Sequence, residues 1–207
     1  MIAFKFIIIA VISYLLGSLN FGVILSRGMK NEDVRESGSG NAGTTNMMRT
    51  YGKTLGLLTI AGDILKVILA IWLAFRIVSV EELKMTLDSA SDYPQVVLKS
   101  FAGLFAVLGH IFPCYFKFKG GKGVATSGGM VIAIDWRIAL ILLAIFALTI
   151  LITKYVSLGS ILMAIFYPVF IGIFYKDIIL VLIALVFTVI VVVAHRENVK
   201  RLINHTE

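Results

Sequence analysis

The sequence predicts an all-α integral membrane protein with seven transmembrane helices. Hydrophobic residues make up 59% of its 207 residues and charged residues only 15%, whereas soluble domains carry about 25% charged residues. The apolar residues form long runs, and the chain has only three prolines that could interrupt helices. A soluble core of this size does not bury so much apolar surface. We therefore expect one polytopic membrane domain over residues 1–207.

Six apolar runs are long enough for a spanning helix, which needs about 20 residues. They are Ile2–Leu25, Leu55–Val78, Val96–Phe116, Ile138–Thr153, Ser157–Tyr175 and Ile178–Ala194. The N-terminal run has one early lysine, Lys5, and no clear cleavage site, so we interpret it as a retained span rather than a signal peptide. A seventh segment, Val124–Ile134, is short for a core of about 30 Å and is either a thin span or a re-entrant loop.

The distribution of basic residues favours seven spans, with the N-terminus outside and the C-terminus in the cytoplasm. Twelve of the 19 basic residues would then lie on one side: Arg27, Lys30, Arg35, Arg49, Lys53, Lys117, Lys119, Lys122, Lys154, Arg196, Lys200 and Arg201. Cytoplasmic loops carry the excess of lysine and arginine, and the loop at residues 81–92 is acidic. A re-entrant fourth segment would send the basic tail outside.

The formal net charge of +7 raises the alternative of a nucleic-acid-binding protein. The basic residues sit between apolar runs rather than along one soluble face, so we expect no nucleic acid and instead anionic lipid and phosphorylated substrates. One cysteine, Cys114, allows no internal disulfide and no CxxC metal site. The three histidines form no local ligand pattern, so we expect no metal. We also expect no cofactor and a monomer.

The first of three polar clusters follows the first apolar run and combines glycines with neutral donors and an arginine. Its members are Gly38, Ser39, Gly40, Asn41, Gly43, Thr45, Asn46 and Arg49. The spacing matches GxGxxG, but no strand precedes it, so we reject a dinucleotide site. Glycines let successive N–H groups turn toward one anion, and the arginine fork suits phosphate. A plain connecting loop with a helix cap is the alternative interpretation.

The second polar cluster follows the third apolar run and sets lysines beside glycines. Its members are Gly109, His110, Lys119, Gly120, Gly121, Lys122 and Gly123. It is not a Walker A loop, because Phe116 stands where the first glycine would be and a glycine follows the lysine. A membrane anchor alone would explain a lysine but not three glycines, so we predict phosphate binding by Lys119 and Lys122. We interpret His110 as a packed, hydrogen-bonded residue rather than a base.

The third polar cluster begins where the last apolar run stops, at His195. Asn198 lies three residues later, so the two side chains share a face if the helix continues, and both could face the other two clusters. The basic residues after them fit a stop-transfer tail. Within the second span, Asp63 and Lys66 are charges at a costly depth, and we expect a structural pair, with a role in supporting the site as the alternative.

These clusters resemble the motifs of the PlsY family, the bacterial membrane acyl-phosphate:glycerol-3-phosphate acyltransferases, over essentially the whole chain. The matching residues are Gly38-Ser39-Gly40-Asn41, Gly43, Thr45-Asn46 and Arg49; Gly109-His110, Pro113 and residues 118–126; and His195-Arg196-Glu197-Asn198, Arg201-Leu202 and Glu207. Asp63 and Lys66 also resemble a polar pair of the family. One departure is His205, which stands where the family pattern has a glycine.

The resemblance implies transfer of a fatty acyl group from acyl-phosphate to the sn-1 hydroxyl of glycerol 3-phosphate, giving lysophosphatidic acid and phosphate for phospholipid biosynthesis. The site would face the cytoplasm at the bacterial cytoplasmic membrane. Two substrates that both carry phosphate match two anion-binding clusters, and an activated donor needs positioning more than a strong nucleophile. A transporter of a phosphorylated organic anion is the alternative, but no convincing inverted repeat favours it.

The resemblance also suggests a role for each residue. Arg49 and Lys122 would hold the phosphate of glycerol 3-phosphate, with Lys119 nearby and Gly120, Gly121 and Gly123 around them. The acyl-phosphate would lie against Gly38, Ser39, Gly40, Asn41, Gly43, Thr45 and Asn46. Asn198 would donate to the developing oxyanion. His195 would act as a base or orient its neighbours, with a substrate phosphate oxygen as the alternative proton acceptor.

Overall fold

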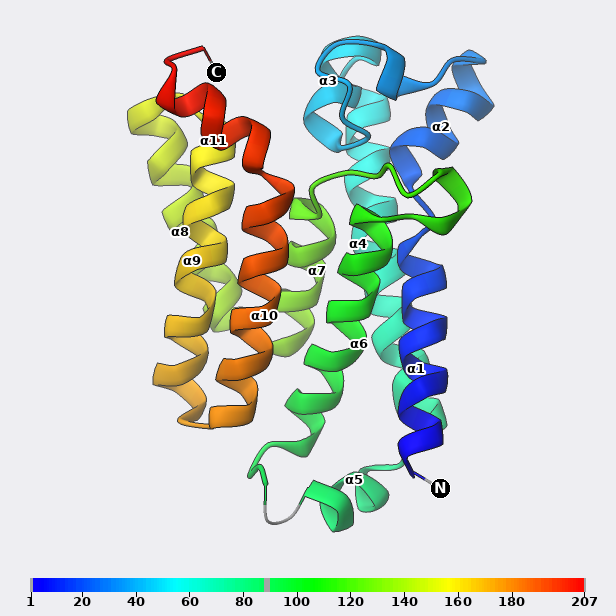
Figure 1. The fold of residues 1–207 in the computed structure, drawn as a ribbon, viewed down its shortest axis with the longest axis vertical. Coiled ribbons are helices and arrows are strands. Elements are labelled where there is room, and N and C mark those ends of the chain that lie inside the picture. Colours follow the sequence, from blue (N-terminus) through cyan, green and yellow to red (C-terminus); the bar gives the residue numbers. More distant parts are fainter. Residues whose placement is uncertain (1, 88–89, 207) are drawn as a thin grey trace. The chain divides into compact units, whose positions relative to one another are not determined.

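The computed structural model describes residues 2–87 and 90–206, and this part of the chain folds into helices and turns without a strand (Figure 1). It divides into two compact units, which are described separately. One unit comprises Met1–Ser79 and Phe101–Met130, and the other Val80–Ser100 and Val131–Glu207. The expectation of a single domain stays a prediction.

The first unit contains the two glycine-rich segments. Its elements are α1 (Ile2–Gly17), α2 (Phe21–Lys30), the 3₁₀ turn η1 (Val34–Glu36), α3 (Thr44–Tyr51), α4 (Lys53–Ile77), most of α6 (Pro94–Ile111), the 3₁₀ turn η2 (Cys114–Phe116) and the start of α7 (Val124–Ile134). We call residues 31–43 the first loop and residues 112–123 the second loop. Both loops lie at the end of the unit opposite the N-terminus (Figure 1).

The first predicted span, Ile2–Leu25, is wrong as a continuous helix, because α1 and α2 are separated by a break at residues 18–20. The Ser18 hydroxyl donates to the Tyr14 carbonyl at 2.8 Å, and the Asn20 side chain caps α2 by accepting from Val23 N at 3.3 Å. Such side-chain bonds to the backbone compete with helix continuation. The two helices together still form one candidate span, Ile2–Lys30.

Two glycines let α1 and α6 touch through their backbones. A Cβ on Gly17 would lie 2.0 Å from the Ala106 carbonyl oxygen, and one on Gly109 would lie 2.1 Å from the Tyr14 carbonyl oxygen. Small residues at such crossings are the usual way for membrane helices to pack closely. Gly109, which belongs to the second cluster, therefore has a packing reason of its own.

The second unit contains α5 (Val80–Leu87), the start of α6, the end of α7, and four further helices: α8 (Trp136–Thr153), α9 (Val156–Tyr175), α10 (Ile178–Ala194) and α11 (Arg196–Ile203). Tight turns join them. Lys154 and Lys176 end their helices in the left-handed region, with φ of 67° and 52°. Asp177 then caps α10 by accepting from Leu180 N at 3.1 Å, and Thr188 Oγ1 ties α10 to the Ala164 carbonyl of α9 at 2.7 Å.

The chain is an all-helical integral membrane protein. Within the described residues, five helices are long and apolar enough to cross a bilayer, or six if α10 and α11, bent by 60°, form one span. Large apolar side chains face outward on these helices, as with Trp72 and Ile152, which are 55% and 79% exposed. Outward apolar surface on this scale needs lipid rather than water around it. The eleven residues of α7 reach only about 17 Å.

Candidate functional site

Asn46 holds the first loop together. Its Oδ1 accepts from Ser39 N at 2.8 Å, and its Nδ2 donates to the carbonyls of Val34 at 3.0 Å and Ser37 at 2.9 Å. The side chain is only 1% exposed, and its bond to the Val34 carbonyl is buried. Asn46 thus fixes the backbone on both sides of Gly38, which has a left-handed φ of 61° and whose added Cβ would lie 2.2 Å from Asn46 Oδ1.

The glycine turn carries its polar side chains outward. Gly40 also has a left-handed φ, of 70°, and its N–H donates to the Ser37 carbonyl at 3.1 Å. Asn41 Oδ1 accepts from Gly43 N at 2.7 Å, which turns the chain into the N-terminus of α3. Ser39 at the tip is exposed. The turn thus leaves the Ser39 side chain exposed close to the start of α3, and helix N-termini favour anions.

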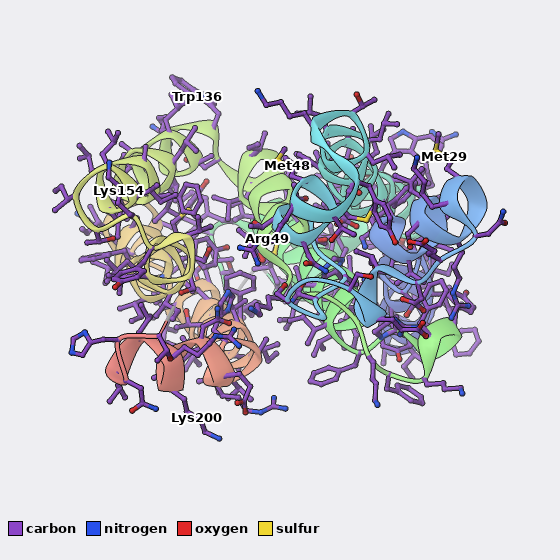
Figure 2. The ribbon with its side chains drawn as sticks, turned by 90° about the horizontal axis from the view of Figure 1, so that it is seen from above. Met29, Met48, Arg49, Trp136, Lys154 and Lys200 are labelled. Atoms are coloured by element: carbon purple, nitrogen blue, oxygen red, sulfur yellow. The ribbon has the colours of Figure 1, made fainter. Side chains whose placement is uncertain are left out.

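Helix α3 has a buried face that contains Met47 and an exposed face that contains Arg49. Met47 is fully buried in a core with Val23, Val34 and Leu55. Arg49 lies two residues later, on the other side of the helix, and is exposed; Figure 2 labels it on α3. Packing of Met47 therefore fixes the direction in which the Arg49 guanidinium leaves the helix.

The second loop folds back onto the end of α6. Gly120 N donates to the Ile111 carbonyl at 3.1 Å, and Gly121 N donates to the His110 carbonyl at 3.2 Å. The approach is so close that a Cβ on Gly120 would lie 2.0 Å from the His110 carbonyl oxygen. Lys119 is exposed and Lys122 half-buried, so two lysines flank a glycine pair that is fixed to a helix end.

A buried ionic cluster lies beneath this loop. Lys66 Nζ is 2.8 Å from Asp63 Oδ1 and 2.8 Å from His110 Nδ1, and it donates to the Leu19 carbonyl at 3.0 Å. The side chains of Asp63 and Lys66 are each 1% exposed. His110 Nδ1 also lies 3.4 Å from Asp63 Oδ1, so the tautomer of the ring decides which of these two neighbours it bonds. The other ring nitrogen is Nε2. A Cβ added to Gly121 would lie 2.2 Å from His110 Nε2, so the ring packs directly against the second loop.

Arg35, which the sequence analysis did not single out, links the two loops. Its Nη1 donates to the carbonyls of Phe116 at 2.9 Å and Lys119 at 2.8 Å. Its Nη2 pairs with Asp33 Oδ2 at 2.6 Å. The Arg35 hydrogen bond holds the pKa of the Asp33 carboxyl well below its usual range, so the carboxylate stays ionised at neutral pH. The first two polar clusters are thereby joined within one unit.

The third cluster lies in the second unit. His195 joins α10 to α11, and its Nδ1 is 2.8 Å from the Val191 carbonyl, to which it donates. His195 and Asn198 are 1% and 4% exposed, whereas Lys200 points away from the helices of its unit (Figure 2). The buried face of α11 therefore carries both predicted residues. Their approach to the first two clusters, and that of Arg49 to Lys122, stay predictions.

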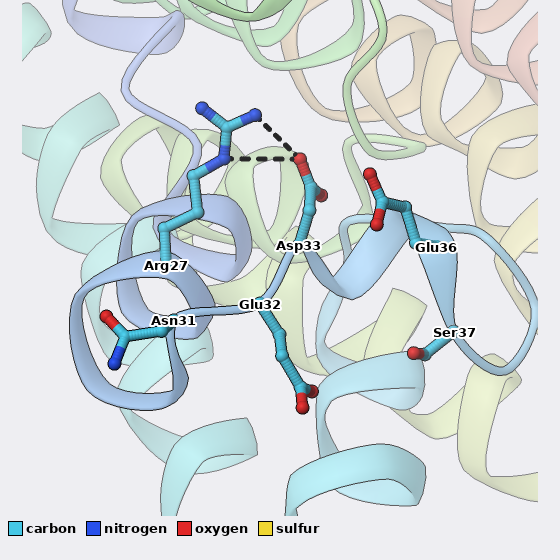
Figure 3. A pocket seen from close by; sticks show the side chains of 6 residues that line it. All are labelled: Arg27, Asn31, Glu32, Asp33, Glu36 and Ser37. Carbon is cyan, nitrogen blue, oxygen red and sulfur yellow. Dashed lines mark hydrogen bonds and ion pairs between the residues drawn. The ribbon is translucent and has the colours of Figure 1, made fainter.

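A cavity of about 540 Å³ opens at the first loop, lined by Arg27, Asn31, Glu32, Asp33, Glu36 and Ser37 (Figure 3). Three carboxylates and one arginine line it, and the arginine is already paired with Asp33 at 2.8 Å. Like charges would repel a phosphate here, so this cavity does not suit either predicted substrate. Within residues 2–87 and 90–206, no group of three or more His, Cys, Asp or Glu residues is placed to hold a metal ion.

Comparison with known proteins identifies the class of enzyme. The family model described as glycerol-3-phosphate acyltransferase matches residues 7–205. The glycerol-3-phosphate acyltransferase of Bacillus subtilis (strain 168) is 41% identical over 200 residues, which cover 97% of this chain and 95% of the relative. That of Clostridioides difficile (strain 630) is also 41% identical, over 207 residues, covering 99% of this chain and 95% of the relative.

Two crystal structures of PlsY, an integral membrane glycerol 3-phosphate acyltransferase, have a similar fold. The glycerol 3-phosphate form has a TM-score of 0.83 at 34% identity, covering 98% of this chain and 94% of that chain. The lysophosphatidic acid form has a TM-score of 0.81 at 32% identity, covering 98% and 93%. This chain belongs to the PlsY family. It is therefore a multi-pass membrane enzyme, a glycerol-3-phosphate acyltransferase of the class that produces lysophosphatidic acid.

Membership of the PlsY family gives His205 a structural meaning. His205 has a left-handed φ of 54°, the region that favours glycine, and Thr206 N bonds back to the Arg201 carbonyl at 2.9 Å. This is the usual helix ending with a glycine at its left-handed position. Histidine at this position keeps the same turn at some conformational cost. Glu207 lies outside the described residues.

Two asparagines of the first loop provide a test of how it is held. Asn46→Asp should lower the unfolding midpoint, because a carboxylate would face the Val34 and Ser37 carbonyls in place of the amide that now donates to both, and each lost hydrogen bond costs about 0.5–1.5 kcal/mol. Asn41→Asp is the matched control, since an aspartate still accepts from Gly43 N. Thermal unfolding of both purified variants in detergent measures the difference, and equal midpoints would contradict the role given to Asn46.

Proposed function

We propose that this enzyme transfers a fatty acyl group from acyl-phosphate to the sn-1 hydroxyl of glycerol 3-phosphate. The hydroxyl oxygen bonds to the acyl carbon, the bond from that carbon to phosphate breaks, and lysophosphatidic acid and inorganic phosphate leave. The observation that best supports this is the pair of glycine loops joined by Arg35. Two adjoining anion sites suit two substrates that each carry a phosphate, and a lipid-facing protein suits an acyl tail.

The two loops would take different substrates. Arg49 and Lys122 bind the phosphate of glycerol 3-phosphate with Lys119 nearby, and Gly120, Gly121 and Gly123 allow the backbone to approach. Ser39 and the N–H groups of the first loop bind acyl-phosphate. In that loop Gly38, Gly40, Gly43, Asn41 and Thr45 surround the donor, and Asn46 acts by fixing the backbone, because both of its polar atoms are already bonded.

The third cluster would act on the reacting carbonyl. Asn198 donates a hydrogen bond to the oxyanion that develops as the hydroxyl attacks. His195 donates from Nδ1 to the Val191 carbonyl, so its neutral ring has the basic nitrogen at Nε2. Either this nitrogen or a substrate phosphate oxygen takes the hydroxyl proton. No cofactor takes part in this chemistry, and a monomer suffices for it.

For the membrane arrangement, we propose seven spans with the N-terminus outside, the C-terminus inside and the site on the cytoplasmic face of the bacterial cytoplasmic membrane. The twelve basic residues of the proposed cytoplasmic segments support this orientation. Eleven residues in α7 would then cross a locally thinned region or one where neighbouring helices cover the ends.

Cysteine labelling tests this topology. After replacement of Cys114, the one native cysteine, single cysteines at Ser37, Lys119 and Asn204 should react with a membrane-impermeant maleimide from the same side. A cysteine at Asp92 should react from the opposite side. Labelling of the Asn204 position together with the Asp92 position would rule out an odd number of spans and separate the proposed site.

Initial-rate kinetics test direct transfer between the two substrates. Purified protein given acyl-phosphate and glycerol 3-phosphate should form lysophosphatidic acid, with intersecting double-reciprocal lines, because both substrates must be bound together. Parallel lines mark a covalent intermediate. Cys114→Ala should stay active. A labelled acyl group trapped on Ser39 or Cys114 without acceptor would exclude direct transfer, and no product at all would exclude the acyl-phosphate donor.

Single substitutions test the assigned roles. Arg49→Ala and Lys122→Ala should each lower kcat/KM for glycerol 3-phosphate about tenfold to hundredfold, since a hydrogen bond to a charged group contributes about 1.5–3 kcal/mol. Arg49→Lys should recover only part of the lost kcat/KM, because lysine lacks the planar fork of arginine. Asn198→Ala should instead lower kcat about 10²-fold as an oxyanion donor. Near-normal kinetics in Arg49→Ala and Lys122→Ala would leave Arg49 and Lys122 only a role as membrane anchors.

A further inference from the structure

The second loop contains a strained turn next to its first substrate-binding lysine. Lys117 and Phe118 both have left-handed φ values, of 58° and 57°. Non-glycine residues rarely adopt this region, because the Cβ crowds the following carbonyl oxygen. Two such residues in succession need outside contacts to hold them, and the turn leads directly into Lys119, Gly120 and Gly121.

Arg35 makes those contacts on both sides of the strained pair. One nitrogen, Nη1, donates to the carbonyl before the pair, that of Phe116, and to the carbonyl after it, that of Lys119, at 2.9 and 2.8 Å. The Arg35 guanidinium carbon also lies 5.8 Å from the centre of the Phe116 ring. Phe116 in turn packs against the buried core that contains Val34 and Met47. The turn is thus fastened to the first loop by polar and apolar contacts.

Asp33 fixes the orientation of this guanidinium. Its Oδ1 accepts from Arg35 Nε at 2.9 Å and from the Arg35 backbone N at 3.0 Å, and its Oδ2 accepts from Nη2 at 2.6 Å. A two-point pair of this kind sets the plane of the arginine as well as its position. Nη1 is left facing the second loop. The Asp33 pKa is held well below its usual range by the Arg35 hydrogen bond, so the pair persists at neutral pH.

Arg27 offers a natural comparison within the same contacts. It donates from Nε and Nη2 to Asp33 Oδ2 at 3.2 and 2.8 Å (Figure 3). Its guanidinium carbon is also 5.8 Å from the Phe116 ring centre. Its side chain is 55% exposed, and among the described residues its recorded hydrogen bonds reach Asp33 alone. Arg27 therefore shares the carboxylate and the ring with Arg35, but not the two loop carbonyls.

We propose that Arg35 is a positioning residue for the acceptor site, holding the turn at residues 116–119 so that Lys119 and Lys122 meet the phosphate of glycerol 3-phosphate. The proposal rests on the proposed function for the identity of that ligand. We assign Arg35 no contact with the substrate, because its Nε, both N–H groups of Nη1 and one of Nη2 already donate to Asp33 and to the second loop. Its effect passes through the second loop to the lysines.

Kinetics of matched variants test the consequence for substrate binding. Arg35→Ala should raise KM for glycerol 3-phosphate about tenfold or more and change kcat much less, whereas Arg27→Ala should stay within about twofold of the parent in both constants. Arg35→Lys should not restore the parent KM, because lysine lacks the planar fork that bonds to Asp33 and to both loop carbonyls at once. General destabilisation would lower the active fraction, and so kcat, without raising KM. Equal KM values in Arg35→Ala and Arg27→Ala would overturn the proposal.

Hydrogen exchange tests the same role without substrate. Amides of residues 114–123, including those of Gly120 and Gly121, should exchange at least about tenfold faster in Arg35→Ala than in Arg27→Ala. Unchanged exchange would overturn the proposal. If Arg35→Ala does not fold, Asp33→Asn takes its place, because it keeps the arginine but removes the charge that orients it. The same amides should then exchange faster in Asp33→Asn than in Arg27→Ala. A parent enzyme without acyltransferase activity would contradict the proposed function, while exchange would still decide whether Arg35 holds the loop.

Discussion

The arrangement of the first unit depends on satisfying one buried ammonium, that of Lys66. Asp63, His110 Nδ1 and the Leu19 carbonyl all lie within 3.0 Å of its nitrogen. The Leu19 carbonyl is available to Lys66 only because the helix is broken between α1 and α2. In a continuous helix the Leu19 carbonyl would accept from Val23 N, but that N–H bonds instead to the Asn20 side chain. The break between α1 and α2 frees an acceptor, and Lys66 uses it, so one charge links this break with α4 and α6. A charge in a membrane span is tolerated only under such conditions.

The same cluster explains why the second loop contains glycines. The carbonyls at the end of α6 lack helical partners, and those of His110 and Ile111 are satisfied by Gly121 N and Gly120 N. These bonds bring the loop so close that any Cβ on Gly120 or Gly121 would collide with the helix end or with the His110 ring. The glycines are therefore required by packing as well as by any anion, and the ring that Lys66 orients lies directly against the loop that carries Lys119 and Lys122.

Features that follow from composition and periodicity could be predicted from the sequence. Hydrogen bonds between residues far apart in the chain could not. Apolar runs gave the membrane class and most helices, and motif residues gave the first two clusters. Asn41 and Asn46 looked equivalent as donors, yet one stabilises a local turn and the other holds three backbone groups as far as twelve residues away. Arg35 was counted only as a loop cation, because its two carbonyl partners lie 81 and 84 residues further along the chain. No local pattern contains such a pairing, although an Asp-x-Arg before a glycine turn hints at a fixed guanidinium.

Burial separates the groups that build the site from those available to substrate. Asn46, His110, Asp63 and Lys66 are all nearly inaccessible, and the bonds of each already hold a loop or a helix. Ser39, Arg49 and Lys119 are exposed on the same framework. On the proposed function, a phosphate would add hydrogen bonds to a loop backbone that is already in place, so little ordering entropy would be lost on binding. If the donor is the acyl-phosphate proposed above, it is already activated, and such positioning supplies most of what the reaction lacks in water. The conformational strain at Lys117–Phe118 and the charge buried at Lys66 are the structural costs of this preorganisation.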